Sequence, residues 1–277
     1  MDNTVFKADH LSFSYGPGQA ALDDVSLEIT QGQKIALLGA NGSGKSTLLK
    51  LLDGLYVPTA GTLSVFGVPL TQALLDDEAY AFALRRRVGF VFQDPDVQLF
   101  SPTVWDDVVF GPLHLGVSAD DVRRRAEQAM QLLGVERLAE RAPHRLSGGE
   151  KKKVALASVL AIRPDVLLLD EPTASLDPRS QANLVDFLYG LNVEQNVTLV
   201  TATHDLGLVN EMADWVYVFG ESHRLIAAGA PADILSQHDL LVSANLIHGH
   251  THRHRAATHA HEHVGIHAHD DMQAGAP

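Results

Sequence analysis

The sequence predicts an α/β fold built on a mainly parallel sheet, and three observations support this prediction. Short apolar segments that indicate buried strands alternate with stretches of helical periodicity along most of the chain. Such alternation is typical of parallel strands joined by helices, with ligands bound at the carboxyl ends of the strands. The segment GANGSGKST, residues 39–47, follows one of these strands and opens a helix. Antiparallel segments before it and a helical stretch after it predict two additions to the sheet.

The expected elements run from an antiparallel ribbon to a closing hairpin. The ribbon is interrupted at Gly16-Pro17-Gly18, and its segments are Val5–Lys7, Leu11–Tyr15 and Leu22–Ile29. Later strands are expected at Lys34–Leu38, Thr62–Phe66, Val88–Phe92, Val166–Leu169, Val197–Ala202, Trp215–Phe219 and Arg224–Ala228. Helices are expected at Leu48–Leu52, Glu78–Arg87, Thr103–Phe110, Ala119–Leu133, Lys151–Ile162, Ser180–Leu191 and Pro231–Leu235. The stretch from about residue 94 to 162 is therefore a helical insertion.

The composition limits the class of protein. Hydrophobic residues are 45% and charged residues 20% of 277 positions, as in globular proteins, and the length allows one large or two modest domains. The apolar runs are too short to span a bilayer, and the N-terminus lacks the layout of a signal peptide. Cysteine is absent, which excludes disulfides and thiolate chemistry. We therefore expect a cytosolic protein. Its net charge of −13 argues against nucleic acid or anionic lipid as a partner, so a membrane should be reached through a protein partner.

Residues 39–47 match the phosphate-binding loop pattern G-x-x-x-x-G-K-[ST] without a mismatch. Glycines let the backbone turn its N–H groups toward an anion, and the positive end of the following helix adds to the attraction. Lys45 is expected to reach the β- and γ-phosphates of a nucleotide, and the Ser46 hydroxyl to ligate Mg²⁺. The residues expected to bind the nucleotide in this loop are Gly39, Ala40, Asn41, Gly42, Ser43, Gly44, Lys45, Ser46 and Thr47.

Polar residues follow the other expected strands of the core. Asp170 and Glu171 come after an apolar run, so we expect Asp170 to hold Mg²⁺ and Glu171 to orient or deprotonate an attacking water. Gln93 offers an amide oxygen to Mg²⁺ or to that water, and His204 offers a donor to the γ-phosphate. The alternative is that the acidic pair caps a helix and that Gln93 and His204 are polar strand ends without a further role.

The segment LSGGE, residues 146–150, indicates a second phosphate site. Ser147 and Glu150 form the pattern of a capping box for the helix that follows. Gly148 and Gly149 are poor helix formers, each costing about 1 kcal/mol relative to alanine, but they leave bare N–H groups that can face an anion. One nucleotide does not need two complete phosphate-binding cradles. Two such sites are explained if, in a pair of subunits, each cradle closes over the cradle of the other subunit.

These motifs, in this order, resemble the full motif set of the ATPase subunits of ABC transporters. The resemblance covers roughly residues 4–240, and its segments are Gly39–Thr47, Gln93, Leu146–Glu150, Val166–Glu171, Ser175-Leu176-Asp177 and His204. It implies a P-loop NTPase (RecA-like) parallel-sheet core with an antiparallel β subdomain and a helical insertion that carries the signature motif. It also implies a head-to-tail dimer, formed with itself or with a paralogue, that sandwiches two ATP molecules with Mg²⁺.

The resemblance also assigns roles to single residues. Tyr15 would be the platform on which adenine stacks, although its position is equally explained by a cross-strand aromatic contact. Gln93 would sense the nucleotide and couple it to the transporter, and Asp177 would contact the other subunit. Glu150 stands where many members carry glutamine, a departure that we regard as tolerated. The residues that would contact the γ-phosphate held by the partner subunit are Ser147, Gly148 and Gly149.

A narrower resemblance lies in residues 93–116, QDPDVQLFSPTVWDDVVFGPLHLG. This segment looks like the corresponding part of the ATPases of energy-coupling factor importers, the cobalt, nickel and vitamin uptake systems. Residues 146–176 and 202–206 resemble the metal-uptake branch of that family. The resemblance implies a groove, after Gln93, that receives helices of a transmembrane partner. Val97, Leu99 and Phe100 suit such a groove, and ordinary core packing is the alternative.

From about Asn245 the sequence becomes a polar tail, so we divide the chain into an ATPase domain, 1–245, and a tail, 246–277. Alternating histidines place neighbouring imidazoles on one side of an extended chain, where two or more can chelate one metal ion such as Ni²⁺ or Co²⁺. With few apolar residues, the tail is expected to be disordered without metal. Metal buffering is our preferred interpretation and a solvated extension the alternative. The nine histidines are His248, His250, His252, His254, His259, His261, His263, His267 and His269.

Together these features predict the ATP-hydrolysing subunit of a nickel or cobalt importer. It would lie at the cytoplasmic face of the cell membrane, held by transmembrane coupling and substrate-binding subunits. A vitamin importer of the biotin or thiamine type is the nearest alternative, and the histidine tail favours metal. A soluble ABC ATPase acting on DNA or in translation is disfavoured, because the chain shows no coiled-coil insertion, tandem cassette or basic bias. A metal-storage protein conflicts with the intact Lys45, Asp170, Glu171 and His204.

Overall fold

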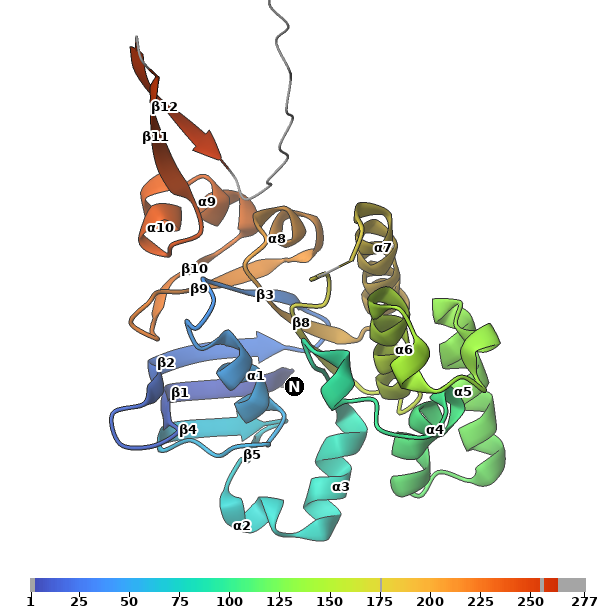
Figure 1. Cartoon of the computed structure of the whole chain (residues 1–277). Helices are drawn as coiled ribbons and strands as arrows, with labels where there is room; N and C mark the ends of the chain where they lie inside the picture. Colours follow the sequence, from blue (N-terminus) through green and yellow to red (C-terminus); the bar gives the residue numbers. More distant parts are fainter. Residues whose placement is uncertain (1–2, 175, 255–256, 264–277) are drawn as a thin grey trace, which may run out of the picture.

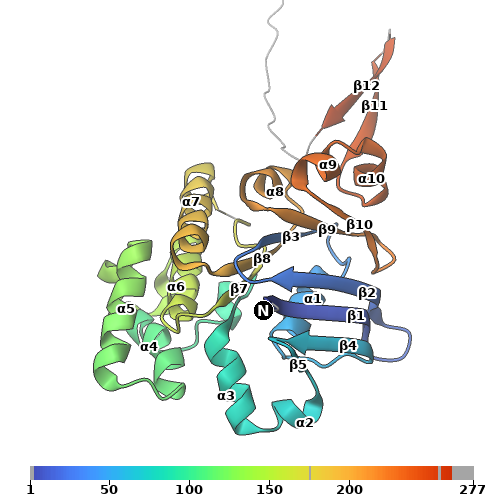
Figure 2. The ribbon, with the colours of Figure 1, turned by 180° about the vertical axis from the view of Figure 1, so that it is seen from behind.

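The computed structural model describes residues 3–174, 176–254 and 257–263. A six-stranded sheet forms the centre, with a four-stranded sheet on one side and a group of helices on the other (Figure 1). The view from behind shows the same arrangement, with a hairpin standing away from the body (Figure 2). The predicted α/β fold, with a parallel core, an antiparallel β subdomain and a helical insertion, is confirmed.

The central sheet has the strand order β10-β9-β3-β8-β7-β6, in which β10 is antiparallel to β9 and the other neighbours are parallel. Strands β7 and β8 are buried along their whole length, as expected for a parallel sheet that is covered on both faces. The strands are β3 (Lys34–Leu38), β6 (Val88–Val91), β7 (Val166–Asp170), β8 (Thr198–Thr203), β9 (Trp215–Phe219) and β10 (Leu225–Gly229).

The second sheet is antiparallel, with the order β2-β1-β4-β5. Its strands are β1 (Thr4–Ser14), β2 (Ala20–Thr30), β4 (Ala60–Val65) and β5 (Val68–Pro69). The sequence predicts two short strands where the structure has the single strand β1. The apparent break is an irregularity between Ala8 and Leu11, where His10 takes a left-handed φ of 49°. The strand therefore continues through a local change of register.

Helix α1 (Lys45–Leu52) lies between the two sheets, and its leucines are fully buried in a core that both sheets share. This packing fixes the antiparallel sheet against the helix that follows residues 39–44. The buried leucines of α1 are Leu48, Leu49, Leu51 and Leu52.

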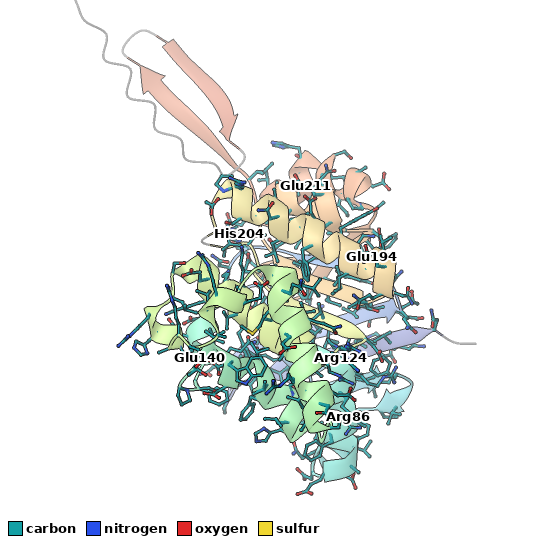
Figure 3. The ribbon with its side chains drawn as sticks, turned by 90° about the vertical axis from the view of Figure 1, so that its right-hand side faces the viewer. Arg86, Arg124, Glu140, Glu194, His204 and Glu211 are labelled. Atoms are coloured by element: carbon teal, nitrogen blue, oxygen red, sulfur yellow. The ribbon has the colours of Figure 1, made fainter. Side chains whose placement is uncertain are left out.

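The helices on the other side come from the insertion and from the segment after β7. Thr103 caps α4 and Ser147 caps α6 through side-chain oxygens, which sets where these helices begin. Figure 3 looks onto this side, with Arg124 labelled on α5 and Glu194 on α7. Within the described ranges, no helix combines the length and the apolar character needed to cross a bilayer. The helices of this group are α4 (Val104–His114), α5 (Ala119–Leu133), α6 (Gly148–Leu160) and α7 (Pro178–Gln195), with 3-10 turns at Pro95–Val97, Glu136–Leu138 and Pro143–Arg145. Two further helices, α2 (Gln72–Leu75) and α3 (Glu78–Arg87), precede the insertion and join β5 to β6.

The last part of the chain packs on the β9 side of the central sheet. Helices α8 (Leu206–Met212), α9 (Pro231–Leu235) and α10 (His238–Ser243) bury a small apolar cluster there, and Leu246 and Ile247 pack against it. The folded part of the chain therefore continues two residues beyond the predicted boundary at 245.

The histidine tail has a regular backbone over part of its length, and the expectation of disorder without metal stays a prediction. Its backbone forms an antiparallel hairpin of β11 (His248–His254) and β12 (Ala257–His263). The alternation that favours metal chelation also has the period of a β-strand, so two such segments can pair. Residues 264–277, with His267 and His269, lie outside the described residues.

Strand β6 packs closely on α6 through a glycine. A Cβ atom added at Gly89 would overlap Val159 Cγ1 and crowd the ring of Pro164. Gly190 in α7 is different, because among the described residues nothing lies within 4 Å of a Cβ added there.

We predict that Gly89→Ala lowers the free energy of unfolding by about 1–3 kcal/mol, because the added methyl group overpacks the contact with α6. Gly190→Ala is the matched control and should raise stability by about 0.5–1 kcal/mol through helix propensity. Urea unfolding of the two variants and the wild type measures both changes. A Gly89→Ala protein as stable as wild type would contradict the packing argument.

Candidate nucleotide-binding and hydrolysis site

The order of the strands brings the polar residues of the sequence motifs together. Strands β3, β8, β7 and β6 are consecutive neighbours in the sheet. Their carboxyl ends lead into the phosphate loop, His204, the Asp170–Glu171 pair and Gln93, respectively. A site for phosphate chemistry is therefore assembled from four segments that are far apart in sequence.

The phosphate loop has the backbone conformation that its glycines predict. Gly42 and Gly44 take φ values of 84° and 110°, and a Cβ at Gly44 would collide with the Ala21 carbonyl oxygen of β2. The Lys45 side chain folds back under the loop, and its Nζ donates to the carbonyl oxygens of Gly39 at 2.6 Å and Ala40 at 3.0 Å. Burial lowers the pKa of Lys45, while the carboxylates of Glu171 and Asp170 oppose that shift. The ammonium group is thus held at the base of an anion cradle.

Ser46 and Asp170 provide adjacent oxygen ligands. Ser46 Oγ, in the first turn of α1, donates a hydrogen bond to Asp170 Oδ1, at the end of β7, at 2.8 Å. Burial raises the pKa of Asp170, an effect that the hydrogen bond from Ser46 opposes. A hydroxyl and a carboxylate beside a phosphate cradle are the hard donors that Mg²⁺ prefers, so these two residues fit that ion.

Glu171 and His204 form the polar pair on the other side of the cradle. Glu171 is 5% exposed, and its Oε1 lies 2.9 Å from His204 Nδ1. The main-chain N–H of Glu171 donates to the Ala202 carbonyl oxygen at 3.0 Å, which fixes the residue against β8. A buried carboxylate held in this way can act as the base for a water molecule.

Lys45, Ser46 and Glu171 line one cavity of about 620 Å³, a size that suits a nucleotide. Asp170 and His204 are outside the lining set and contact it through Ser46 and Glu171, respectively. Tyr15 and Gln93 line it together with the phosphate loop and Glu171. The Tyr15 ring is 51% exposed and its hydroxyl lies 3.1 Å from Thr47 Oγ1, so its position suits the predicted adenine platform. The rings of Phe13 and Tyr56 meet Tyr15 edge to face, at 5.1 and 5.7 Å between centroids.

Three predicted residues lie away from this cavity and form the start of α6. Ser147, Gly148 and Gly149 are outside the set that lines the cavity. Ser147 and Glu150 make the predicted capping box, with Ser147 Oγ and main-chain N–H both donating to the Glu150 carboxylate. Among the described residues, nothing lies within 4 Å of a Cβ added at Gly148. The helix end is therefore open to a group from outside the subunit.

Asp177 also lies outside the cavity. It caps α7 by accepting hydrogen bonds from Ser180 N at 3.1 Å and Ser180 Oγ at 2.6 Å, and these bonds lower the pKa of its carboxyl. The neighbouring Ser175 is outside the described residues.

The segment after Gln93 divides into exposed and buried residues. Val97 and Phe100 are 65% and 66% exposed, which suits the predicted groove. Leu99 is 8% exposed and belongs to the main core, so its assignment to the groove is wrong and the packing alternative holds for it. Phe100 stacks edge to face on Phe110 of α4, which extends the exposed apolar patch.

Two residues near the site were missed by the sequence reasoning. His223, in the turn between β9 and β10, lines the nucleotide cavity, and Lys152 of α6 donates to the carbonyl oxygens of Glu171 and Pro172. Lys152 lies within residues 146–176, which resemble the metal-uptake branch, but no role was assigned to it, and His223 lies outside the motifs. A positive φ of 62° at His223 is a structural signal that the sequence does not carry.

Comparison with known proteins agrees with this geometry. The ABC transporter family profile matches residues 22–174. The nickel import ATP-binding protein NikO of Rhodobacter capsulatus is 51% identical over 88% of the chain and 96% of its own length. The energy-coupling factor transporter ATP-binding protein EcfA of Methanoculleus marisnigri is 46% identical over 82% of the chain and 79% of its length.

Solved structures of ABC transporter components are also similar to this chain. The chain is similar to cbiO1 of Clostridium perfringens, described as part of the ABC transporter complex cbiONQ, with 36% identity, a TM-score of 0.75, and coverage of 88% of this chain and 96% of that one. It is also similar to the ATP-binding cassette MJ0796, solved as a dimer with ADP and phosphate, with 28% identity, a TM-score of 0.74, and coverage of 82% and 98%.

We predict that Glu171→Gln lowers the rate of ATP hydrolysis by about 10²–10⁴-fold while ATP still binds, because the amide keeps the shape of the side chain but cannot accept a proton. Steady-state hydrolysis and equilibrium ATP binding are measured on the same preparation. Glu194→Gln, the same change on the exposed end of α7, is the control and should hydrolyse ATP like wild type. Normal hydrolysis by Glu171→Gln would contradict the role of this carboxylate.

Proposed function

The chain belongs to the ATP-hydrolysing subunits of ABC transporters, and we propose that it powers an importer for nickel or cobalt ions. The observation that carries the proposal is the 51% identity to a nickel import ATP-binding protein over almost the whole length of both chains. The histidine-rich tail supports a metal cargo, since imidazole is a preferred ligand of both ions.

The residues of the cavity, with Asp170 and His204 bonded to two of them, supply the parts needed to hydrolyse ATP. The loop N–H groups and Lys45 hold the phosphates, and Ser46 and Asp170 hold Mg²⁺, which as a Lewis acid offsets charge on the phosphate oxygens. Glu171 orients a water and accepts its proton, and His204 keeps the Glu171 carboxylate in place. Gln93 stands at the exposed side of the cavity, at the start of the segment that leads to Val97 and Phe100.

We further propose that two subunits close head to tail over two ATP molecules. The start of α6 supports this proposal, because Ser147 and Gly148 are exposed and all three residues of the Ser147–Gly149 segment lie outside the set that lines the cavity of their own subunit. Bare N–H groups at a helix start attract the γ-phosphate of a nucleotide bound by the other subunit. The likeness to MJ0796, solved as a dimer, gives further support.

The exposed apolar patch is the proposed contact with the membrane partner. The patch consists of Val97 and Phe100, in the segment that follows Gln93, and of Phe110 on α4, whose ring meets that of Phe100. If helices of a transmembrane subunit pack here, a movement of Gln93 on binding or hydrolysis of the nucleotide would be transmitted to them. This contact would hold the protein at the cytoplasmic face of the membrane.

An importer for a vitamin is the second candidate. The 46% identity to an energy-coupling factor transporter ATP-binding protein supports it, because that class of importer is not restricted to a metal cargo. Both candidates use the same ATP cycle and differ in the cargo that other subunits bind.

The tail is proposed to chelate Ni²⁺ or Co²⁺ near the importer. In the hairpin, His248 lies opposite His263, His250 opposite His261, and His252 opposite His259. This register puts three cross-strand pairs on one face of the hairpin, which supports binding of metal by histidines of both strands.

Uptake of trace Ni²⁺ and Co²⁺ by cells tests the proposed cargo. Cells with Glu171→Gln should lose uptake of one metal almost completely, because the importer cannot complete its ATP cycle. Expression of the variant and its presence at the membrane are checked by immunoblotting. If neither metal's uptake changes, the metal assignment is wrong and the vitamin importer becomes the leading function.

The role of the tail is tested by deleting residues 248–277. This boundary keeps Leu246 and Ile247, which pack on the core. We expect uptake at scarce metal to fall several-fold and ATP hydrolysis to stay unchanged. A variant with the tail histidines replaced by asparagine separates chelation from length, and an unchanged uptake curve for both variants would refute the proposal.

A further inference from the structure

The backbone at Glu171 is in a conformation that needs support. Its φ is +45°, in the left-handed region that residues other than glycine rarely adopt and that is strained for them. Since this residue carries the carboxylate of the hydrolysis site, whatever holds its backbone also sets the position of that carboxylate.

Lys152 of α6 supplies a direct support. Its Nζ donates to the Glu171 carbonyl oxygen at 2.9 Å and to the Pro172 carbonyl oxygen at 3.4 Å. The Glu171 carbonyl also accepts from Ala174 N at 3.1 Å, so the turn after β7 is held from inside and from α6. A cationic donor to carbonyl oxygens makes a stronger bond than a neutral one.

The surroundings of Lys152 fit this role. Its side chain lines an apolar cavity with Phe92, Leu169 and Leu176, where water competes little for the ammonium group. Burial lowers the pKa of Lys152, and the carboxylates of Glu171 and Asp170 raise it, so the charge is placed in the field of the site's two acids. The neighbouring Lys151 is engaged elsewhere, with its Nζ 2.5 Å from Asp96 in the segment after Gln93.

We propose that Lys152 is a positioning residue for ATP hydrolysis. It holds the carbonyl oxygens of Glu171 and Pro172, which keeps Glu171 in its left-handed conformation and its carboxylate beside His204 and the nucleotide cavity. The proposal rests on ATP hydrolysis at this site and is independent of the cargo of the importer.

The test compares Lys152→Met and Lys152→Arg with wild type, using full-length protein. Methionine keeps the apolar stem and removes the donor, so kcat should fall about tenfold, while KM for ATP and the melting temperature stay near wild type. Arginine retains donors on a side chain of similar length and should recover much of the lost kcat. Lys151→Met, which removes the same charge from the adjacent position, is the control and should keep kcat within about twofold.

A double variant separates positioning from general damage. If Lys152 acts through Glu171, adding Lys152→Met to Glu171→Gln should lower the residual rate little further, so the two effects are not additive. A full tenfold loss in the Glu171→Gln background, or a wild-type kcat in Lys152→Met alone, would overturn the proposal. A loss of kcat that follows a lower melting temperature would also overturn it. Because hydrolysis is measured without cargo, failure of the metal assignment leaves this result unaffected.

Discussion

The pairing of β3, β8 and β7 as parallel neighbours is the constraint on which the site depends. Their registers bring the Asp170 end of β7 level with Ala202 of β8, and Leu38 of β3 level with Thr203. Ser46 can then reach Asp170 at 2.8 Å, and Glu171 can reach His204 at 2.9 Å. A shift of one residue along β7 would turn Asp170 to the opposite face of the sheet and separate it from the phosphate loop.

The carboxyl edge of these strands brings together charged groups whose burial costs free energy. Lys45, Asp170 and Glu171 are each about 5% exposed, and the pKa values of Lys45 and Asp170 are shifted by burial toward their neutral forms. Their opposite charges offset part of that cost, and the fully buried strands behind them keep the edge rigid. A nucleotide with Mg²⁺ would supply further charged partners at this edge and would thereby stabilise the folded protein.

The fold and most of the cavity follow from the sequence because the signals there are local. Apolar runs predicted the core strands, and glycine spacing predicted the loop whose Gly42 and Gly44 take positive φ. Leu99 was misassigned because an apolar residue beside a predicted groove has the same sequence signal as one in the core. Lys152 and His223 escaped prediction because their roles depend on tertiary contacts between segments that no local pattern connects.

The start of helix α6 is exposed at the surface of the subunit, and the next turn of the same helix contacts the hydrolysis site. Ser147 lies at its exposed start, and Lys152, five positions later in the sequence, holds the Glu171 turn. A regular helix rises 1.5 Å per residue and bends little over so short a length, so displacement of its start is transmitted to Lys152. In the proposed head-to-tail dimer, the start of α6 meets the nucleotide of the partner. Closure over one nucleotide would then act on Glu171 beside the other nucleotide, so the proposed dimer implies that hydrolysis at one site depends on the state of the other.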